Sequence, residues 1–397
     1  MTPGPAGNLR RPQSGGPARV TNVELFFDLV YVFAVTQLSH YLIDHPTVTG
    51  GLQTLLLLAM VWLIWAYTTW VTNWLDPDRI PVRLMLLGLA LVSLVMSAAL
   101  PFAFGGRGLA VGAAYAVMQI GRSLFAVFGL RGDRLQRNFE RILAWCVVSG
   151  TLALAGGLVA GRARELLWLA AVCVDVLGGV AGFWTPGLGR SSTQDWTIEG
   201  SHFAERCQAF ILIAIGESIV VTGATLSGLP KVGGMEVATF VAAFVSSVGL
   251  WWLYFHRSAE AGAQAIASSA DPGRLGRSAY HLIHPVMVAG IIVVAAGDQI
   301  ALSVPEAVGH VAVSVMLLGG TALFLLGHAL FKLVIWGQVS WARIGGAVVA
   351  IALGLLAPHV SALVLSICAA AVVVAVATAD HLAESPRRTV RTGLDLR

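Results

Sequence analysis

The segment from Val23 to Leu38 is apolar and long enough to lie within a membrane, yet it carries two carboxylates, Glu24 and Asp28. A charged side chain inside a membrane helix costs about 2.5 kcal/mol or more on insertion scales, so such residues usually face a protein interior or a water-filled cavity. Because the two acids stand four residues apart, they project from one face of a helix. We therefore expect the functional site on that face.

The composition indicates an integral membrane protein. Charged residues make up 12% of the 397 residues and apolar residues 57%, whereas roughly 25% charged residues are usual in soluble domains. A net charge of +4 is too small to suggest nucleic acid as a partner. No nucleotide-binding loop is present, and no cofactor is expected. The sequence predicts an all-α polytopic membrane helix bundle.

Twelve apolar segments of about 20 residues can each be placed across a bilayer. They lie near 23–43, 51–74, 82–103, 108–130, 139–160, 165–185, 201–226, 235–256, 279–302, 308–331, 340–357 and 359–379. Most Lys and Arg residues in the connecting segments then lie on one side of the membrane. Those on the other side are Arg107, Arg162, Arg164 and Lys231. The positive-inside rule then predicts that both termini are cytoplasmic. We expect a disordered tail over 1–20, a membrane domain over 21–380, and a basic tail over 381–397.

Similar features in the two halves suggest a duplication. The first and seventh spans begin with acids, Glu24 and Glu205, and the second and eighth share Trp-x-Tyr at Trp65 to Tyr67 and Trp252 to Tyr254. An even number of spans in each half would make the halves parallel repeats, about an axis along the membrane normal. Residues 21–190 and 200–380 are the expected repeats.

Polar residues within the spans are the candidates for function, because each is costly to bury in lipid. We expect a proton relay or general acid among Glu217, Asp28, Glu24 and Asp298. We expect substrate or ion contacts from Arg206, Glu205, His281, His284, Gln37, Arg122, Trp65, Tyr67, Trp252 and Tyr254. Arg122 and Arg206 are expected to pair with the acids and hold helices in register. Glu217 lies deep in an apolar run, and a carboxyl buried in that way is expected to be neutral at rest.

Some of these residues can also be explained by a purely structural role. Thr21-x-x-Glu24 matches a helix capping box, which would leave Asp28 as the more informative acid. His281 and His284 are neighbours on one helix face, but Pro285 follows at once, which favours a kinked helix entrance with satisfied histidines. No complete set of metal ligands is visible there, and no metal is expected. The aromatic residues near 62–74 and 251–255 are typical of an interfacial belt, although Trp62, Trp65 and Tyr67 lie too deep for all of them to belong to it and could line a cavity.

These residues also support a family resemblance. The run from Glu24 to Ala34, the pair Glu205 and Arg206, residues 216–218, and the segment from Tyr280 to Pro285 resemble the bacterial low temperature requirement A family of membrane proteins. The resemblance implies an integral protein of the bacterial inner membrane. The family is named for a cold-growth phenotype, so the resemblance implies no defined chemistry.

Two function classes follow from the sequence. The first is a transporter or channel for protons, cations or a small solute, with Glu217 and Asp298 toward the outside and Asp28, Arg206 and His284 as an inner gate. The second is an intramembrane enzyme on a lipid or isoprenoid, with Glu217 or Asp28 as an acid that protonates an alkene or epoxide. A structural partner in a membrane complex is a third reading. The expected partners are the bilayer and a small ion, solute or lipid, and a homodimer is left open.

Overall fold

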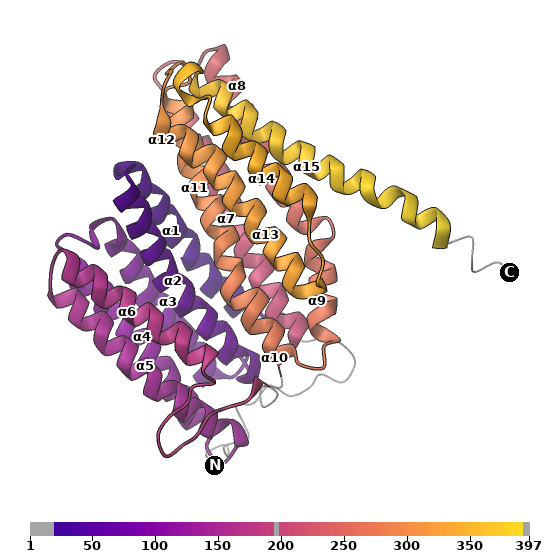
Figure 1. The fold of residues 1–397 in the computed structure, drawn as a ribbon. Coiled ribbons are helices and arrows are strands. Elements are labelled where there is room, and N and C mark those ends of the chain that lie inside the picture. Colours follow the sequence, from indigo (N-terminus) through magenta and orange to yellow (C-terminus); the bar gives the residue numbers. More distant parts are fainter. Residues whose placement is uncertain (1–19, 194–197, 392–397) are drawn as a thin grey trace. The chain divides into compact units, whose positions relative to one another are not determined.

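The structure is a computed structural model that describes residues 20–193 and 198–391. All the named elements in these ranges are helices, which confirms the predicted all-α class (Figure 1). The tail predicted over 1–20 lies, apart from Val20, outside the described residues. The chain divides into two compact units, and α7, α9 and α11 each contribute to both.

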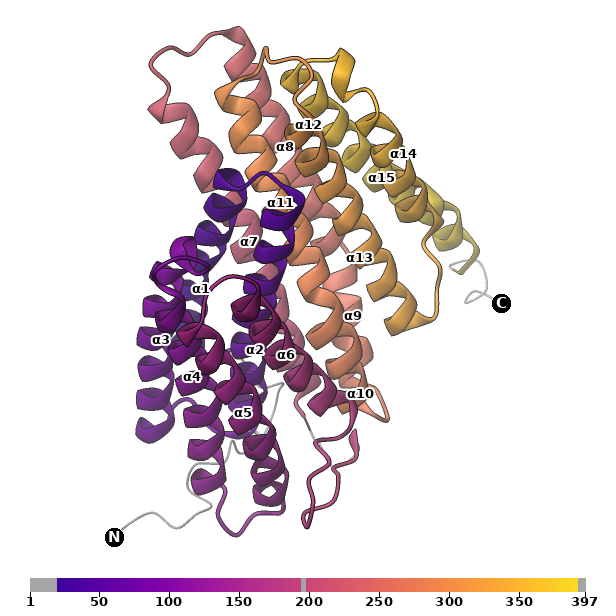
Figure 2. The ribbon, with the colours of Figure 1, turned by 60° about the vertical axis from the view of Figure 1, so that its left-hand side comes forward.

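Unit 1 comprises residues up to Ile213 together with 262–285. Its long helices are α1 (Asn22–Asp44), α2 (Val48–Trp74), α3 (Ile80–Ala99), α4 (Gly108–Gly129), α5 (Arg134–Leu158) and α6 (Arg162–Val180). It also contains the first part of α7 (Gly200–Gly228), the end of α9 (Ser258–Ala267), α10 (Pro272–Leu275) and a π-helical segment, Gly276–Ile283. Helix α4 packs between α3 and α5, and α5 packs on α6 (Figure 2). Helix α2 contacts α1, α4 and α6, so its side chains form much of the core of this unit.

Unit 2 comprises residues 214–261 and 286–397. It holds the second part of α7, α8 (Gly234–Phe255), most of α11 (His284–Ser303), α12 (Val311–Ser314), α13 (Gly320–Trp336), α14 (Trp341–Gly354) and α15 (Ala362–Arg391). A π-helical segment, Val315–Gly319, joins α12 to α13. Helix α14 packs against both α13 and α15, and α15 also packs along α8. Helix α15 continues to Arg391, into the segment that the sequence assigned to a tail.

Helices lie over all twelve predicted spans, and among the described residues ten helical segments are long and apolar enough to cross a membrane. The other two are α6 and α14. Helix α6 has 19 residues and carries four charged side chains, Arg162, Arg164, Glu165 and Asp175. Helix α14 has 14 residues, which cover roughly 21 Å of a hydrocarbon layer about 30 Å thick.

Many large apolar side chains remain exposed on the outer faces of the helices. On α3, for example, Leu84 is 62% exposed and Leu91 is 64% exposed. A soluble domain rarely exposes apolar surface over so large an area. An α-helix pairs its backbone polar groups internally along its length, as a lipid environment requires. The exposed faces are therefore suited to contact with acyl chains.

Glycine allows α4 and α5 to approach closely. A Cβ atom on Gly112 would lie 2.2 Å from the carbonyl oxygen of Ala153, and one on Gly157 would lie 2.9 Å from that of Gly108. Small residues at such spacing let helix backbones approach one another in membranes. Gly112 and Gly157 thus mark a close contact between α4 and α5.

Replacing Gly112 by leucine should destabilise unit 1, because the added side chain would force α4 away from α5. Overpacking of this kind typically costs about 1–3 kcal/mol. The matched control is Gly121→Leu in the same helix, where an added Cβ meets nothing within 4 Å. Thermal unfolding in detergent should show a lower transition temperature for Gly112→Leu and a nearly unchanged one for Gly121→Leu. Equal temperatures for the two variants would contradict the close contact.

Candidate functional site

Helix α1 begins with the capping box that the sequence suggested. The side chain of Thr21 accepts a hydrogen bond from the backbone N–H of Glu24 at 3.4 Å, and Glu24 Oε2 accepts one from the backbone N–H of Thr21 at 2.9 Å. This arrangement satisfies backbone donors that the first turn of a helix leaves without partners. Glu24 is nevertheless fully buried, and its carboxylate has further partners.

Arg206 on α7 binds both acids of α1. Its Nε and Nη2 donate to Asp28 Oδ2 and Oδ1 at 2.9 and 2.6 Å, and its Nη1 donates to Glu24 Oε1 at 3.0 Å. All three side chains are at most 1% exposed. A guanidinium fork binding a carboxylate through two parallel bonds is among the strongest polar contacts in proteins. The expectation that Arg206 pairs with the acids is confirmed.

His202 extends this group toward α2. Its Nε2 lies 3.1 Å from Glu24 Oε1, and its Nδ1 lies 3.3 Å from the amide nitrogen of Asn73. Because an amide NH2 is a donor, His202 Nδ1 is assigned as the acceptor and Nε2 as the donor to Glu24. We call Glu24, Asp28, His202 and Arg206 the ionic cluster. With a neutral His202, the four side chains together carry one net negative charge.

Trp65 of α2 completes the surroundings of Asp28. Its indole Nε1 donates to Asp28 Oδ1 at 2.7 Å, and its ring lies 5.8 Å from the guanidinium carbon of Arg206. The ring also contacts Trp62 and Phe210, at centroid distances of 4.9 and 4.7 Å. The structure therefore brings Trp65, Asp28, Glu24 and Arg206, all predicted site residues, into one contact group within unit 1.

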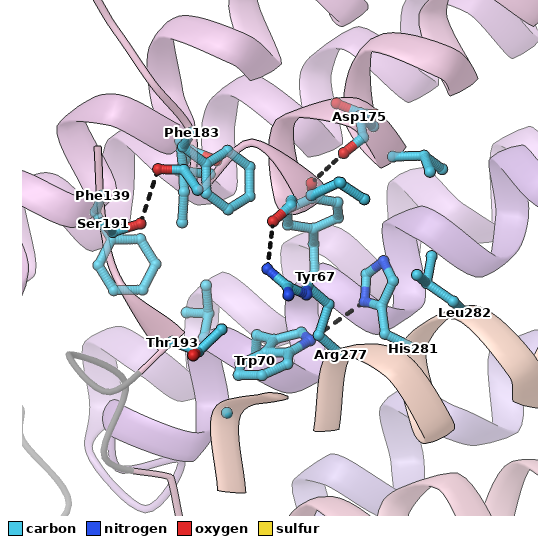
Figure 3. Close-up of a pocket in the computed structure, with 18 of the residues that line it drawn as sticks. Tyr67, Trp70, Phe139, Asp175, Phe183, Ser191, Thr193, Arg277, His281 and Leu282 are labelled. Carbon is cyan, nitrogen blue, oxygen red and sulfur yellow. Dashed lines mark hydrogen bonds between the residues drawn. The ribbon is translucent and has the colours of Figure 1, made fainter. Parts of the chain in front are cut away.

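A second polar group of unit 1 lines a pocket (Figure 3). The pocket contains about 770 Å³ not filled by atoms, a volume that includes its opening. Its walls are largely apolar and aromatic, with Tyr67, Trp70, Trp74, Phe139 and Phe183. Its charged or titratable lining residues are Arg122, Asp175, Arg277 and His281. This composition, apolar with a few convergent polar groups, is typical of small-molecule sites.

Asp175 on α6 is held by neutral donors. Its carboxylate accepts hydrogen bonds from the Tyr115 hydroxyl and from the Gln119 amide, both on α4. The Tyr67 hydroxyl donates to the backbone carbonyl oxygen of Asp175 at 2.9 Å, as Figure 3 shows. Tyr67 therefore joins α2 to α6 beside the pocket.

Arg122 differs from the sequence expectation. Its guanidinium donates to the carbonyl oxygen of Ile64 at 3.2 Å and to Gln119 Oε1. Within the described part of the chain no carboxylate lies at ion-pair distance from Arg122, and its Nε has no hydrogen-bond partner. The oxygens of Gln119 and of the Ile64 backbone thus take the place of the carboxylate that was expected beside Arg122.

The segment before Pro285 is π-helical over Gly276–Ile283, in line with the kinked entrance expected from the sequence. Proline has no N–H, so the carbonyl oxygen of His281 lacks its α-helical donor. The indole Nε1 of Trp62 supplies a hydrogen bond to that oxygen at 2.7 Å. The ring of His281 also accepts a hydrogen bond, from Trp70 Nε1 to its Nδ1 at 3.2 Å. His284 Nδ1 lies 3.2 Å from the carbonyl oxygen of Ala279. Both histidines are therefore held by local contacts.

Unit 2 contains the remaining predicted acids. Glu217 on α7 is 2% exposed and Asp298 on α11 is 1% exposed. Next to Glu217, the Ser218 hydroxyl lies 3.4 Å from that of Ser247 on α8. Asp298 Oδ2 has no hydrogen-bond partner among the described residues. Asp298 is thus a buried carboxyl with spare hydrogen-bonding capacity.

The other predicted site residues have varied surroundings. Trp252 is 41% exposed and stacks on His256, with ring centroids 4.6 Å apart. Tyr254 is fully buried, and its ring lies 5.9 Å from that of His328. Glu205 and Gln37 are half-buried. No group of three or more His, Cys, Asp or Glu side chains placed to hold a metal ion occurs in the described ranges.

Sequence reasoning missed several contributors to these groups. Asn73 and Thr72 contact the ionic cluster, Tyr115 and Gln119 bind Asp175, and Arg277 lines the pocket. Asn73 and Gln119 are polar residues within apolar spans, and that signal was available. Arg277 stands just outside a predicted span, so its part in a pocket could not be recognised from the sequence.

The helices and their buried polar groups define a multi-pass membrane protein. The model of the bacterial low temperature requirement A protein family (LtrA) matches residues 19–378, and the chain belongs to this family. It is 34% identical over 376 residues to the uncharacterized protein RA0937 of Rhizobium meliloti (strain 1021), which covers 94% of this chain and 91% of that protein. No solved structure matches the chain.

Replacing Trp65 by phenylalanine should destabilise the protein, because Asp28 would lose a buried hydrogen-bond donor. Such a loss typically costs about 1–3 kcal/mol. Trp252→Phe is the matched control, since its ring is 41% exposed. Thermal unfolding of the two variants in detergent should show a clear loss for Trp65→Phe only. A loss of the same size in both variants would mean that the indole bond to Asp28 contributes nothing specific.

Proposed function

We propose that this protein is a membrane transporter or channel that moves protons, or moves a cation or small solute together with protons. Asp298 and Glu217 are the proton-binding carboxyls in this proposal. The protein works in the bacterial inner membrane with both termini in the cytoplasm, as the distribution of Lys and Arg residues favours.

The proposal rests mainly on the burial and the unfilled hydrogen-bonding capacity of the Asp298 carboxyl. Its side chain is 1% exposed within a membrane-spanning segment, and its Oδ2 has no hydrogen-bond partner among the described residues. An ionisable residue in such a position is costly to keep unless it has a function. A carboxyl with an open acceptor site can take up and release a proton without breaking an existing hydrogen bond. Glu217, a second acid buried in unit 2, is the other candidate for this step.

The ionic cluster is less suited to carry a mobile proton. Both oxygens of Asp28 already accept bonds from Arg206, and Trp65 adds a third bond. Binding a proton there would break contacts that link α1, α2 and α7. The cluster therefore serves mainly to hold these helices, and the same reasoning disfavours Asp28 as the acid of an intramembrane enzyme.

Asp298→Asn should abolish proton flux while leaving the protein folded, because an amide is nearly the same size as the carboxyl but cannot titrate. Purified protein in liposomes would be driven by a potassium diffusion potential, with an entrapped pH-sensitive dye as the readout. The flux of Asp298→Asn should fall at least tenfold, and Glu217→Gln should also lower it. The matched control is Glu306→Gln, an exposed acid eight residues further along the chain.

Wild-type flux in Asp298→Asn would contradict the role of this carboxyl. If wild-type liposomes show no protein-dependent flux with protons or with added sodium or potassium, the transport proposal fails. Mass spectrometry of lipids extracted from the same liposomes after addition of isoprenoids tests the alternative enzyme. A new lipid product without flux would favour that alternative.

A further inference from the structure

We infer that the pocket of unit 1 binds an amphipathic anion, with a phosphate or carboxylate head against Arg122 and Arg277 and an apolar tail against the aromatic walls. The inference goes beyond the proposed transport of protons and does not depend on it. All the residues that line the pocket belong to unit 1, whereas Asp298 and Glu217 belong to unit 2.

The charge of the lining residues favours an anion. Two guanidinium groups, those of Arg122 and Arg277, line the pocket, against one carboxylate, that of Asp175. Its Oδ2 is bound by the neutral donors Tyr115 and Gln119, and its Oδ1 has no hydrogen-bond partner among the described residues. Neither arginine forms an ion pair with a carboxylate of residues 20–193 or 198–391. Buried positive charge without a paired anion is costly, so a bound anion would stabilise this arrangement.

Donors remain to contact such an anion. Arg122 is fully buried and its Nε has no hydrogen-bond partner among the described residues. Arg277 is half-buried and uses Nη1 to donate to the carbonyl oxygen of Gly179 at 2.9 Å. Because the indole N–H of Trp70 is a donor, His281 Nδ1 must accept, which leaves His281 Nε2 to carry the hydrogen. Guanidinium groups suit phosphate and carboxylate oxygens in particular, since their planar N–H groups match that geometry.

The walls and the position of the pocket favour a molecule with an apolar tail. Trp70, Trp74, Phe139 and Phe183 provide a mainly apolar surface around the charged groups. Trp74 is the last residue of α2, Phe139 lies near the start of α5, and Gly179 lies near the end of α6. The pocket therefore extends from the helix ends, where lipid headgroups meet the hydrocarbon layer, inward to Arg122, which lies seven residues before the end of α4 at Gly129. A ligand with its head between Arg122 and Arg277 would have the aromatic rings of the pocket against its tail.

The polar groups at the edge of the pocket are already engaged, which limits the ligand contacts to the charged residues. Ser191 Oγ donates to the carbonyl oxygen of Gly182 at 3.0 Å, and Thr193 Oγ1 donates to Asp271 Oδ2 at 2.7 Å. These bonds attach the segment around Ser191, seen in Figure 3, to its surroundings. Specificity for the head should therefore depend on the arginines.

The test is binding of dodecyl phosphate to the full-length protein in an uncharged detergent, followed by tryptophan fluorescence because Trp70 and Trp74 line the pocket. Dodecanol has the same tail without the charge, and methyl phosphate has the same head without the tail. Dodecyl phosphate should bind at least tenfold more tightly than either. Equal binding of dodecanol would show that the arginines do not select an anion, and equal binding of methyl phosphate would reduce the site to one for soluble anions; either result overturns the inference.

Variants locate the binding. Arg277→Gln should weaken dodecyl phosphate binding at least tenfold, whereas Arg131→Gln, at an exposed position, should not change it. Gly179→Leu should block the pocket, because Gly179 lines it and an added Cβ there meets nothing within 4 Å, so the larger side chain can be accommodated. Gly121→Leu is the matched control. Wild-type binding by both Arg277→Gln and Gly179→Leu would overturn the inference, whatever the flux assay shows.

Discussion

The bidentate contact between Arg206 and Asp28, extended to Glu24, is the interaction on which unit 1 most depends. Two carboxylates lie fully buried in a helix that is apolar enough to cross a membrane. Their desolvation has to be offset by a cation with well-aligned donors. Arg206 provides three such bonds at 2.6–3.0 Å, and Trp65 adds one from α2. The contact therefore fixes the register of α1, α2 and the first part of α7.

The same requirement for paired polar groups separates the buried residues into two kinds. In the ionic cluster, both oxygens of Asp28 accept hydrogen bonds from neighbouring side chains. Asp298 Oδ2, Asp175 Oδ1 and Arg122 Nε, by contrast, have no hydrogen-bond partner among the described residues. Residues of the first kind stabilise helix contacts. Residues of the second kind are where a proton or a ligand can bind without displacing protein contacts.

Local sequence signals predicted part of this arrangement. The capping box at Thr21 and Glu24 follows from residues three apart, and the irregular helix before Pro285 follows from the missing N–H of proline. Charge balance was enough to predict that Arg206 binds the acids. The positions of the helices followed from apolar length, although α14 is shorter than a usual span and α6 carries four charges. The orientation in the membrane and the internal repeat stay predictions.

The contacts that complete each site could not be read from the sequence, because they join residues far apart in the chain. Trp62 and His281 are separated by 219 positions, and Tyr115 and Asp175 by 60. Trp62 was expected in an interfacial belt or at an aromatic-lined cavity, and its hydrogen bond depends on a carbonyl oxygen that loses its α-helical donor at Pro285. Arg122 was expected beside an acid, but its guanidinium donates to the carbonyl oxygen of Ile64, 58 positions away. Single-residue patterns do not contain such pairings.

The measurement that tests the account most directly is the stability of the ionic cluster when its charges are removed singly and together. The free energy of unfolding in detergent would be compared for Arg206→Gln, for Glu24→Gln with Asp28→Asn, and for all three changes combined. Arg206→Gln alone should lose about 3–5 kcal/mol, because it leaves two buried carboxylates without their cation. The triple variant should lose less than the sum of the other two. Losses that simply add would contradict the claim that these charges stabilise unit 1 through one another.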